Sequence, residues 1–150
     1  MAAPAPAEPA NARTAPDLTV SLLEGGTFEL SRERGHPVLI LFTASWCQPC
    51  IPEVNKMAQL SDEFAARGLR QIVVSIDSGD TAADFDGLRR RTKGQKLLWG
   101  LDIQQRALGA YQIQATDTKV LVDAQGRIAF TSVGPTDYQR LRTEVARALP

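Results

Sequence analysis

A run of five large apolar residues, Val38 to Phe42, stands out in the hydrophobic pattern of the chain. Strands that are covered on both faces, as in a parallel sheet, have this pattern. A polar turn follows, and then apolar residues recur at close to helical spacing from Ile51 to Arg67. Gly68 is suited to end such a helix. The pattern therefore predicts a buried strand, a turn and an amphipathic helix.

Strands and helices alternate on both sides of this unit. Apolar and polar residues alternate from Leu18 to Leu30 around Gly25-Gly26, which is typical of a β-hairpin. The later predicted elements are strand 69–76, helix 81–91, strand 97–99, helix 103–110, strands 119–123 and 127–132, and a last helix capped by Thr136. The fold class predicted from this order is α/β, a central mixed sheet flanked by helices.

The first part of the chain has a different composition. Residues 1–16 are rich in Ala and Pro, which predicts a disordered or polyproline-like tether before a single domain at 17–150. They lack a basic start followed by an apolar run, so they do not form an intact signal peptide. No window approaches the ~20 apolar residues of a membrane span. A signal or anchor is thus expected to be absent from this chain.

The charge balance and the cysteine content of the chain argue against some classes of function. Acidic and basic residues balance at 17 each, which argues against nucleic acid as a partner. Both cysteines of the chain, Cys47 and Cys50, lie in the polar turn. A structural zinc site usually needs four ligands, and these two thiols with His36 make only three. We therefore expect redox use of the thiols, with no metal and no cofactor.

The turn has the chemistry of dithiol exchange, in which one exposed thiolate attacks a disulfide and a second thiol resolves the product. Cys47 is predicted to attack, because a helix N-terminus lowers the pKa of a thiol. Cys50, inside the helix, is predicted to be shielded and to resolve. Trp46 and Pro49 are predicted substrate contacts beside these sulfurs, although Trp46 could equally pack under the loop.

Several motifs together resemble the thioredoxin fold, and specifically the extracytoplasmic thiol-disulfide oxidoreductases of the TlpA/ResA type. The resemblance covers about residues 15–149. It is carried by Gly35-His36-Pro37-Val38-Leu39, Ala44-Ser45-Trp46-Cys47-Gln48-Pro49-Cys50, Glu53, Val74-Ser75-Ile76-Asp77 and Leu121-Val122-Asp123-Ala124-Gln125-Gly126-Arg127-Ile128. Residues 77–101 resemble the helix and strand that this family adds to minimal thioredoxins.

The resemblance implies a function as well as a fold. It implies a reductase of protein disulfides in an oxidising compartment, periplasmic or membrane-tethered, that receives electrons from a membrane or soluble thiol donor. A monomer is expected. Thioredoxins proper have a buried Asp in the strand before the motif, where this chain has Leu41. Glu53 and Asp77 are then the candidates for proton transfer, and both could equally be surface residues.

A second departure concerns the family's cis-proline, which is replaced by Asp117 after Thr116. Thr116 is expected to present its backbone to the substrate, with Asp117 beside it. A cis bond before a non-proline residue costs about 2.5–4 kcal/mol, which favours a trans bond that displaces this edge, but the sequence leaves both forms open. If Asp117 stays beside Cys47, its charge should raise the pKa of Cys47 and make the couple more reducing. The replacement could also be tolerated with modest effect.

Two other functions stay open at this point because of Asp117. In the first, loss of the proline opens the dithiol to a metal, and the chain is a metal-binding or metal-delivery protein that uses Cys47 and Cys50, for example as a dimer. In the second, Asp117 has weakened the redox function and the chain is a binding module.

Overall fold

One mixed sheet organises the computed structural model, which describes residues 13–150. Its strands are β1 (Thr19–Leu22), β2 (Thr27–Glu29), β3 (Val38–Thr43), β4 (Arg70–Ser75), β5 (Leu98–Asp102), β6 (Thr118–Val122) and β7 (Ile128–Val133). The strand order is β2-β1-β5-β4-β3-β6-β7. β3, β4 and β5 run parallel, and the other pairs are antiparallel.

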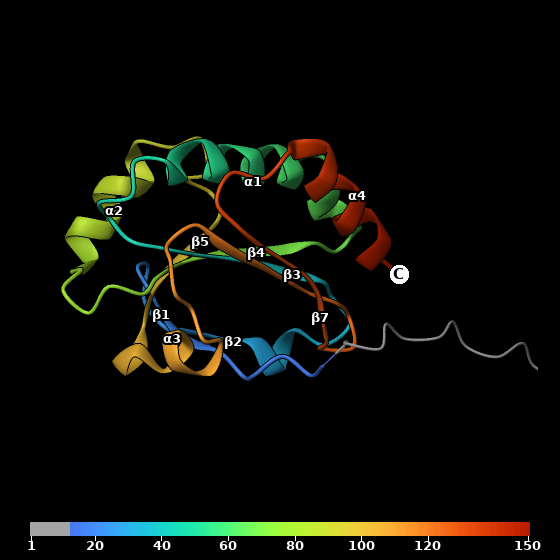
Figure 1. Cartoon of the computed structure of the whole chain (residues 1–150), viewed down its shortest axis with the longest axis horizontal. Helices are drawn as coiled ribbons and strands as arrows, with labels where there is room; N and C mark the ends of the chain where they lie inside the picture. The colour runs from blue at the N-terminus through green and yellow to red at the C-terminus, as the bar shows by residue number, and fades with distance from the viewer. Residues whose placement is uncertain (1–12) are drawn as a thin grey trace, which may run out of the picture.

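Helices cover both faces of this sheet (Figure 1). They are α1 (Cys50–Phe64), α2 (Ala82–Arg90), α3 (Arg106–Ala110) and α4 (Tyr138–Ala148), with short 3-10 turns at Leu30–Glu33, Ala65–Arg67 and Ile103–Gln105. α1, α2 and α4 lie on one face and α3 on the other. The predicted α/β class, with a mixed sheet between helices, is confirmed. No helix within residues 13–150 is long and apolar enough to cross a membrane.

β3 is buried along its whole length, because both of its faces are covered. Leu39 and Leu41 pack with α1 residues such as Met57, while Ile40 and Phe42 belong to the core on the α3 side. Complete burial of one such side chain contributes about 1.5–3 kcal/mol. The continuous apolar run therefore fixes β3 at the centre and sets the position of the turn that follows.

The predicted N-terminal hairpin and the added helix-strand segment are both present. β1 pairs with β2 in an antiparallel ladder, with Val20 opposite Phe28. The added segment forms α2 and β5, and β5 lies between β4 and β1. A Cβ at Gly100 of β5 would lie 2.3 Å from Val20 Cγ1, so glycine is needed for this close pairing.

The first described residues already belong to the domain. Ala15 is buried and its N–H donates to the β6–β7 turn, while the Tyr111 hydroxyl donates to the carbonyl of Pro16 at 2.6 Å. Residues 1–12 of the predicted tether lie outside the described residues. For residues 13–16, the prediction of a disordered segment is wrong, because the domain binds their backbone groups.

Two other local predictions need correction. The predicted helix 103–110 is broken, because Gln104 and Gln105 have positive φ, and α3 begins only at Arg106. The Asp102 carboxylate accepts from the N–H groups of Ala107 and Leu108, which stabilises the start of α3. The last helix is capped by Asp137, whose side chain accepts from the Arg140 N–H, and not by Thr136.

Candidate active site

The two cysteines form a disulfide at the end of the central strand. β3 ends at Thr43, and α1 begins at Cys50, so the motif turn connects the two elements as predicted. Cys50 is completely buried, in agreement with its predicted shielding. Cys47 is only 4% exposed, so in this oxidised state it lacks the exposure that was expected of the attacking sulfur.

The surface around the disulfide is formed by the neighbours of Cys47. Trp46 is 62% exposed, so the alternative that it packs under the loop is wrong. Its indole Nε1 donates to Asp77 Oδ2 at 2.7 Å. Pro49 is also exposed, as is Gln48, which accepts a hydrogen bond from Arg91. The two predicted contacts, Trp46 and Pro49, are therefore available to a partner molecule.

Asp77, a predicted proton-transfer residue, is half-buried beside this surface. Its Oδ1 accepts from the Gly79 N–H at 2.8 Å, and its Oδ2 accepts from Trp46. The hydrogen bond from Gly79 and then that from Trp46 hold the pKa of Asp77 below its usual range. Both oxygens are thus engaged, and the carboxylate orients the indole.

The sequence interpretation missed Asp80, which anchors the motif loop. Its Oδ2 accepts from the Ser45 N–H at 2.8 Å and its Oδ1 accepts from the Ser45 hydroxyl at 2.6 Å. The Ser75 hydroxyl also donates to Oδ2, at 2.6 Å. Thr43 at the end of β3 pairs with Ser75 at the end of the parallel strand β4. This pairing brings together the loops that follow the two strands, and so could have indicated the contact between Ser45 and Asp80.

Removal of the Asp80 carboxylate should loosen the loop that holds Cys47. We expect Asp80→Ala to lower the free energy of unfolding by about 1–3 kcal/mol, because donors on Ser45 and Ser75 lose their acceptor. The exchange rate of the reduced protein should also fall. Denaturant unfolding and single-turnover reduction of a disulfide measure the two effects.

The control for this variant is Asp84→Ala. Asp84 forms a capping box with Thr81 at the start of α2, so its loss destabilises the helix without a contact to the motif loop. The Asp84→Ala protein should therefore lose stability but keep its exchange rate. Equal losses of rate in the two variants would contradict the anchoring role of Asp80.

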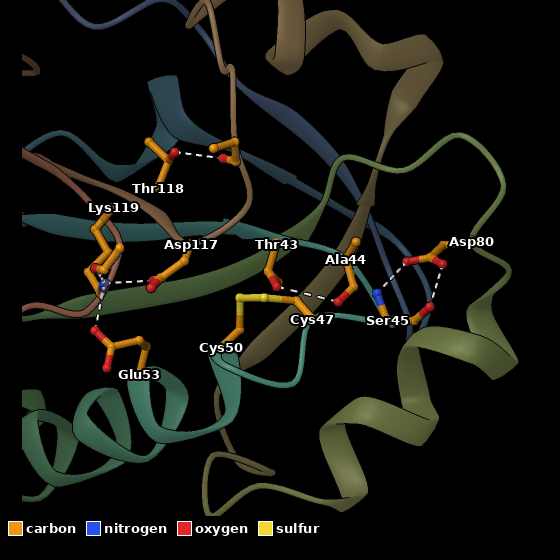
Figure 2. The surroundings of a disulfide bond; sticks show 12 residues. Thr43, Ala44, Ser45, Cys47, Cys50, Glu53, Asp80, Asp117, Thr118 and Lys119 are labelled. Atoms are coloured by element: carbon orange, nitrogen blue, oxygen red, sulfur yellow. Dashed lines mark hydrogen bonds and ion pairs between the residues drawn. A yellow bond between two sulfur atoms is a disulfide. The ribbon is translucent and has the colours of Figure 1, made fainter.

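A buried group of charges lies on the other side of the disulfide (Figure 2). Lys119 of β6 is completely buried and stands opposite Leu41 of β3. Its Nζ lies 2.7 Å from Asp117 Oδ1 and 2.8 Å from Glu53 Oε1, and it donates to the Gly134 carbonyl at 3.0 Å. Lys119 was not a predicted site residue. In the sequence, the only indication of its role was that a lysine lies within a strand that is otherwise expected to be buried.

Glu53 belongs to this buried group, so the alternative that it is a surface residue is wrong. It is 1% exposed, and Oε1 also accepts from the Thr136 N–H at 2.8 Å, while Oε2 accepts from Lys56 Nζ at 2.7 Å. Burial by itself raises the pKa of Glu53, but the hydrogen bonds from Lys119 and Lys56 outweigh it and hold the pKa below its usual range. Glu53 is therefore a carboxylate with both oxygens engaged.

Asp117 takes a different backbone conformation from the family's proline. No peptide bond within residues 13–150 is cis, so the bond between Thr116 and Asp117, which the sequence left open, is trans. Asp117 has a φ of +60°, and its carbonyl accepts from the Gly134 N–H at 2.9 Å. Thr116 beside it is half-buried. The backbone of Asp117 is thus tied to the segment after β7.

The side chain of Asp117 is 4% exposed, and its two oxygens differ. Oδ1 accepts from Lys119, whereas Oδ2 has no hydrogen-bond partner. Burial raises the pKa of Asp117, and the opposing effect of Lys119 is smaller. The structure therefore brings Glu53 and Asp117 together near the disulfide, while Asp77 lies with Trp46 on the outer side.

The two thiols have no third metal ligand among the residues that the structure describes. Within residues 13–150, no group of three or more His, Cys, Asp or Glu side chains is placed to hold a metal ion. His36, the third ligand considered from the sequence, has its Nδ1 3.2 Å from the Gly68 carbonyl in the connection before β3.

The chain is similar to a known protein family and to proteins named for thiol-disulfide exchange. The model of the AhpC/TSA family matches residues 12–131. The thiol-disulfide oxidoreductase ResA of Geobacillus thermodenitrificans is 30% identical over 137 residues, which cover 91% of this chain and 77% of that protein. ResA of Bacillus anthracis is 27% identical over 139 residues, 92% of this chain and 78% of that protein.

Solved structures gave a consistent result. A DsbE-type thiol:disulfide interchange protein from Chlorobium tepidum superimposes with a TM-score of 0.83 at 25% identity, over 93% of this chain and 97% of that one. The thioredoxin domain of a thiol-disulfide oxidoreductase from Bacteroides vulgatus has a TM-score of 0.81 at 22% identity, over 95% of this chain and all of that domain, and supports the same fold.

Proposed function

The chain belongs to the AhpC/TSA family and is a thioredoxin-like thiol-disulfide oxidoreductase related to ResA, and on this premise we propose that it reduces disulfides of extracytoplasmic proteins. The single observation that carries the proposal is the Cys47–Cys50 disulfide, which lies between the central strand and the first residue of α1. Proteins with this arrangement exchange disulfides through their two thiols.

We assign the two sulfurs different roles. The Cys47 thiolate attacks one sulfur of the substrate disulfide, forms a mixed disulfide and releases the other substrate sulfur as a thiolate. The Cys50 thiolate then attacks Cys47 Sγ, which closes the Cys47–Cys50 disulfide and releases the second substrate thiolate. Two electrons pass from the protein to the substrate. The complete burial of Cys50 supports its role as the resolving residue.

The substrate contacts are assigned to the surface around the sulfurs. Exposed Trp46 and Pro49 offer apolar area beside Cys47, and Thr116 and Asp117 form the neighbouring edge. Because the Asp117 carbonyl already accepts from Gly134, Thr116 is the residue of this edge that we expect to bind substrate backbone.

The proposed function includes a cellular compartment and an electron donor. We expect an extracytoplasmic site of action, periplasmic or membrane-tethered, because protein disulfides persist in oxidising compartments. A membrane-bound or soluble thiol donor would return the disulfide to the dithiol state, and the chain would act as a monomer. The comparisons do not support the metal-binding protein or the binding module as alternatives.

Stoichiometric reduction of a protein disulfide tests the function. The reduced chain is mixed with oxidised insulin under anaerobic conditions, and both proteins are followed by thiol labelling and mass spectrometry. We expect each chain to open one insulin disulfide and to become the Cys47–Cys50 disulfide. Unreactive thiols, or a metal bound at one equivalent after purification under reducing conditions, would overturn the proposal in favour of one of the alternatives.

A further inference from the structure

Asp117 Oδ2 is a buried polar atom without a hydrogen-bond partner in the oxidised protein. Nearly all buried polar atoms in proteins have a hydrogen-bond partner, so an unpartnered oxygen here is unusual. One explanation is a partner that is present only in another state of the molecule. The state that differs here is the reduced dithiol, in which each sulfur can carry a proton.

The fold places the Asp117 carboxylate in the buried surroundings of the disulfide. Lys119 joins the Asp117 carboxylate to Glu53, and Glu53 lies one helical turn after Cys50 on α1. Figure 2 shows the Asp117 carboxylate between Lys119 and the disulfide, on the Cys50 side. Cys50 is completely buried in the oxidised protein, which separates its sulfur from bulk water.

The other carboxylates near the motif are engaged elsewhere. Glu53 accepts from Lys56, Lys119 and the Thr136 N–H, and Asp77 accepts from Trp46 and Gly79. Lys119 binds only Oδ1 of Asp117 and leaves Oδ2 free. Burial raises the pKa of Asp117 and so makes it a stronger base, whereas the pKa of each of the other two is lowered.

We propose that Asp117 Oδ2 accepts the proton of the Cys50 thiol when the mixed disulfide is resolved, an inference that rests on the proposed function. The O–H bond forms at Oδ2 as the S–H bond of Cys50 breaks. The resulting thiolate attacks Cys47 Sγ, and the substrate sulfur leaves with the electron pair of the broken S–S bond. The proton on Asp117 then passes to water or to the departing thiolate.

The Asp117→Asn variant removes the base and keeps the size of the side chain. With a labelled disulfide substrate in stopped flow, formation of the mixed disulfide at Cys47 should stay within a few-fold of wild type. Resolution by Cys50 should slow on the order of 10²-fold at neutral pH, the usual contribution of a general base. The difference in resolution rate between Asp117→Asn and wild type should become smaller as pH rises, because hydroxide can then remove the thiol proton.

The pH profile separates proton transfer from a structural role. In the wild-type protein, resolution should slow as pH falls through the raised pKa of Asp117, where Oδ2 becomes protonated. The charged groups that face Asp117 are Lys119 from β6 and Glu53 and Lys56 from α1. The control is Glu63→Gln, which removes a more exposed α1 carboxylate paired with Arg142, outside the buried group, and should resolve at the wild-type rate. Parallel profiles for wild type and Asp117→Asn would overturn the inference.

The experiment distinguishes a failure of the proposed function from a failure of the role assigned to Asp117. If Cys47 forms no mixed disulfide in the wild-type protein, the proposed function fails. If the mixed disulfide forms and Asp117→Asn resolves it at the wild-type rate, only the inference fails. Should the variant not fold, carboxyl ¹³C NMR of the wild-type protein decides. The Asp117 signal should titrate differently in the oxidised and reduced states, and identical titrations would count against a Cys50 contact.

Discussion

The Cys47→Ser variant should fold normally and lose all disulfide reductase activity, because the attacking thiolate is gone and the buried Cys50 cannot reach a substrate. Its circular dichroism spectrum should match that of the reduced wild-type protein. The insulin reduction rate should fall to the uncatalysed background.

Cys50→Ser is the matched control, since it removes the other half of the same disulfide. This variant should still attack through Cys47 and then stop as a stable mixed disulfide, visible by non-reducing gel electrophoresis and mass spectrometry. The two variants would thus separate attack from resolution. Activity retained by Cys47→Ser, or a mixed disulfide trapped at Cys50 instead, would reverse the assigned roles.

Lys119→Met should be the most destabilising substitution among those considered. It leaves the buried carboxylates of Glu53 and Asp117 without their shared cation. Loss of one partner from a buried ion pair costs about 3–5 kcal/mol, so the free energy of unfolding at neutral pH should fall by about that amount. Urea unfolding of the oxidised protein measures it.

Two further variants show whether the loss comes from unpaired charge. Adding Glu53→Gln and Asp117→Asn to Lys119→Met removes the charges, and most of the stability should return. Arg142→Met breaks the exposed pair with Glu63 and should leave the free energy of unfolding nearly unchanged. A Lys119→Met protein as stable as wild type would mean that Lys119 contributes little to the folded state.

Features set by local pattern were predictable from the sequence. The apolar run of β3, the Gly25-Gly26 hairpin and the spacing of Cys47 and Cys50 each depend on neighbouring residues, and all are present as expected. The resemblance to the TlpA/ResA type was likewise confirmed by the relatives named ResA. The fold followed from these features together.

Contacts between distant residues were not predictable in the same way. Glu53 could be a surface or a buried residue until Lys119, far along the chain, was placed against it. The same holds for Glu53 and the Thr136 N–H, which are 83 residues apart. Asp80 was missed for the same reason, since its partner Ser45 lies on another loop. The break at Gln104 and Gln105 reflects left-handed backbone that a helical pattern does not reveal.

The pairing of Asp117 with Lys119 also limits which residue can follow Thr116 in any descendant of this chain. Proline has a φ near −65°, whereas Asp117 has +60°, so a return to the family's residue requires a different backbone here. It would also leave Lys119 with one carboxylate fewer. The two positions should therefore be epistatic, because the effect of a change at 117 depends on whether residue 119 carries a charge.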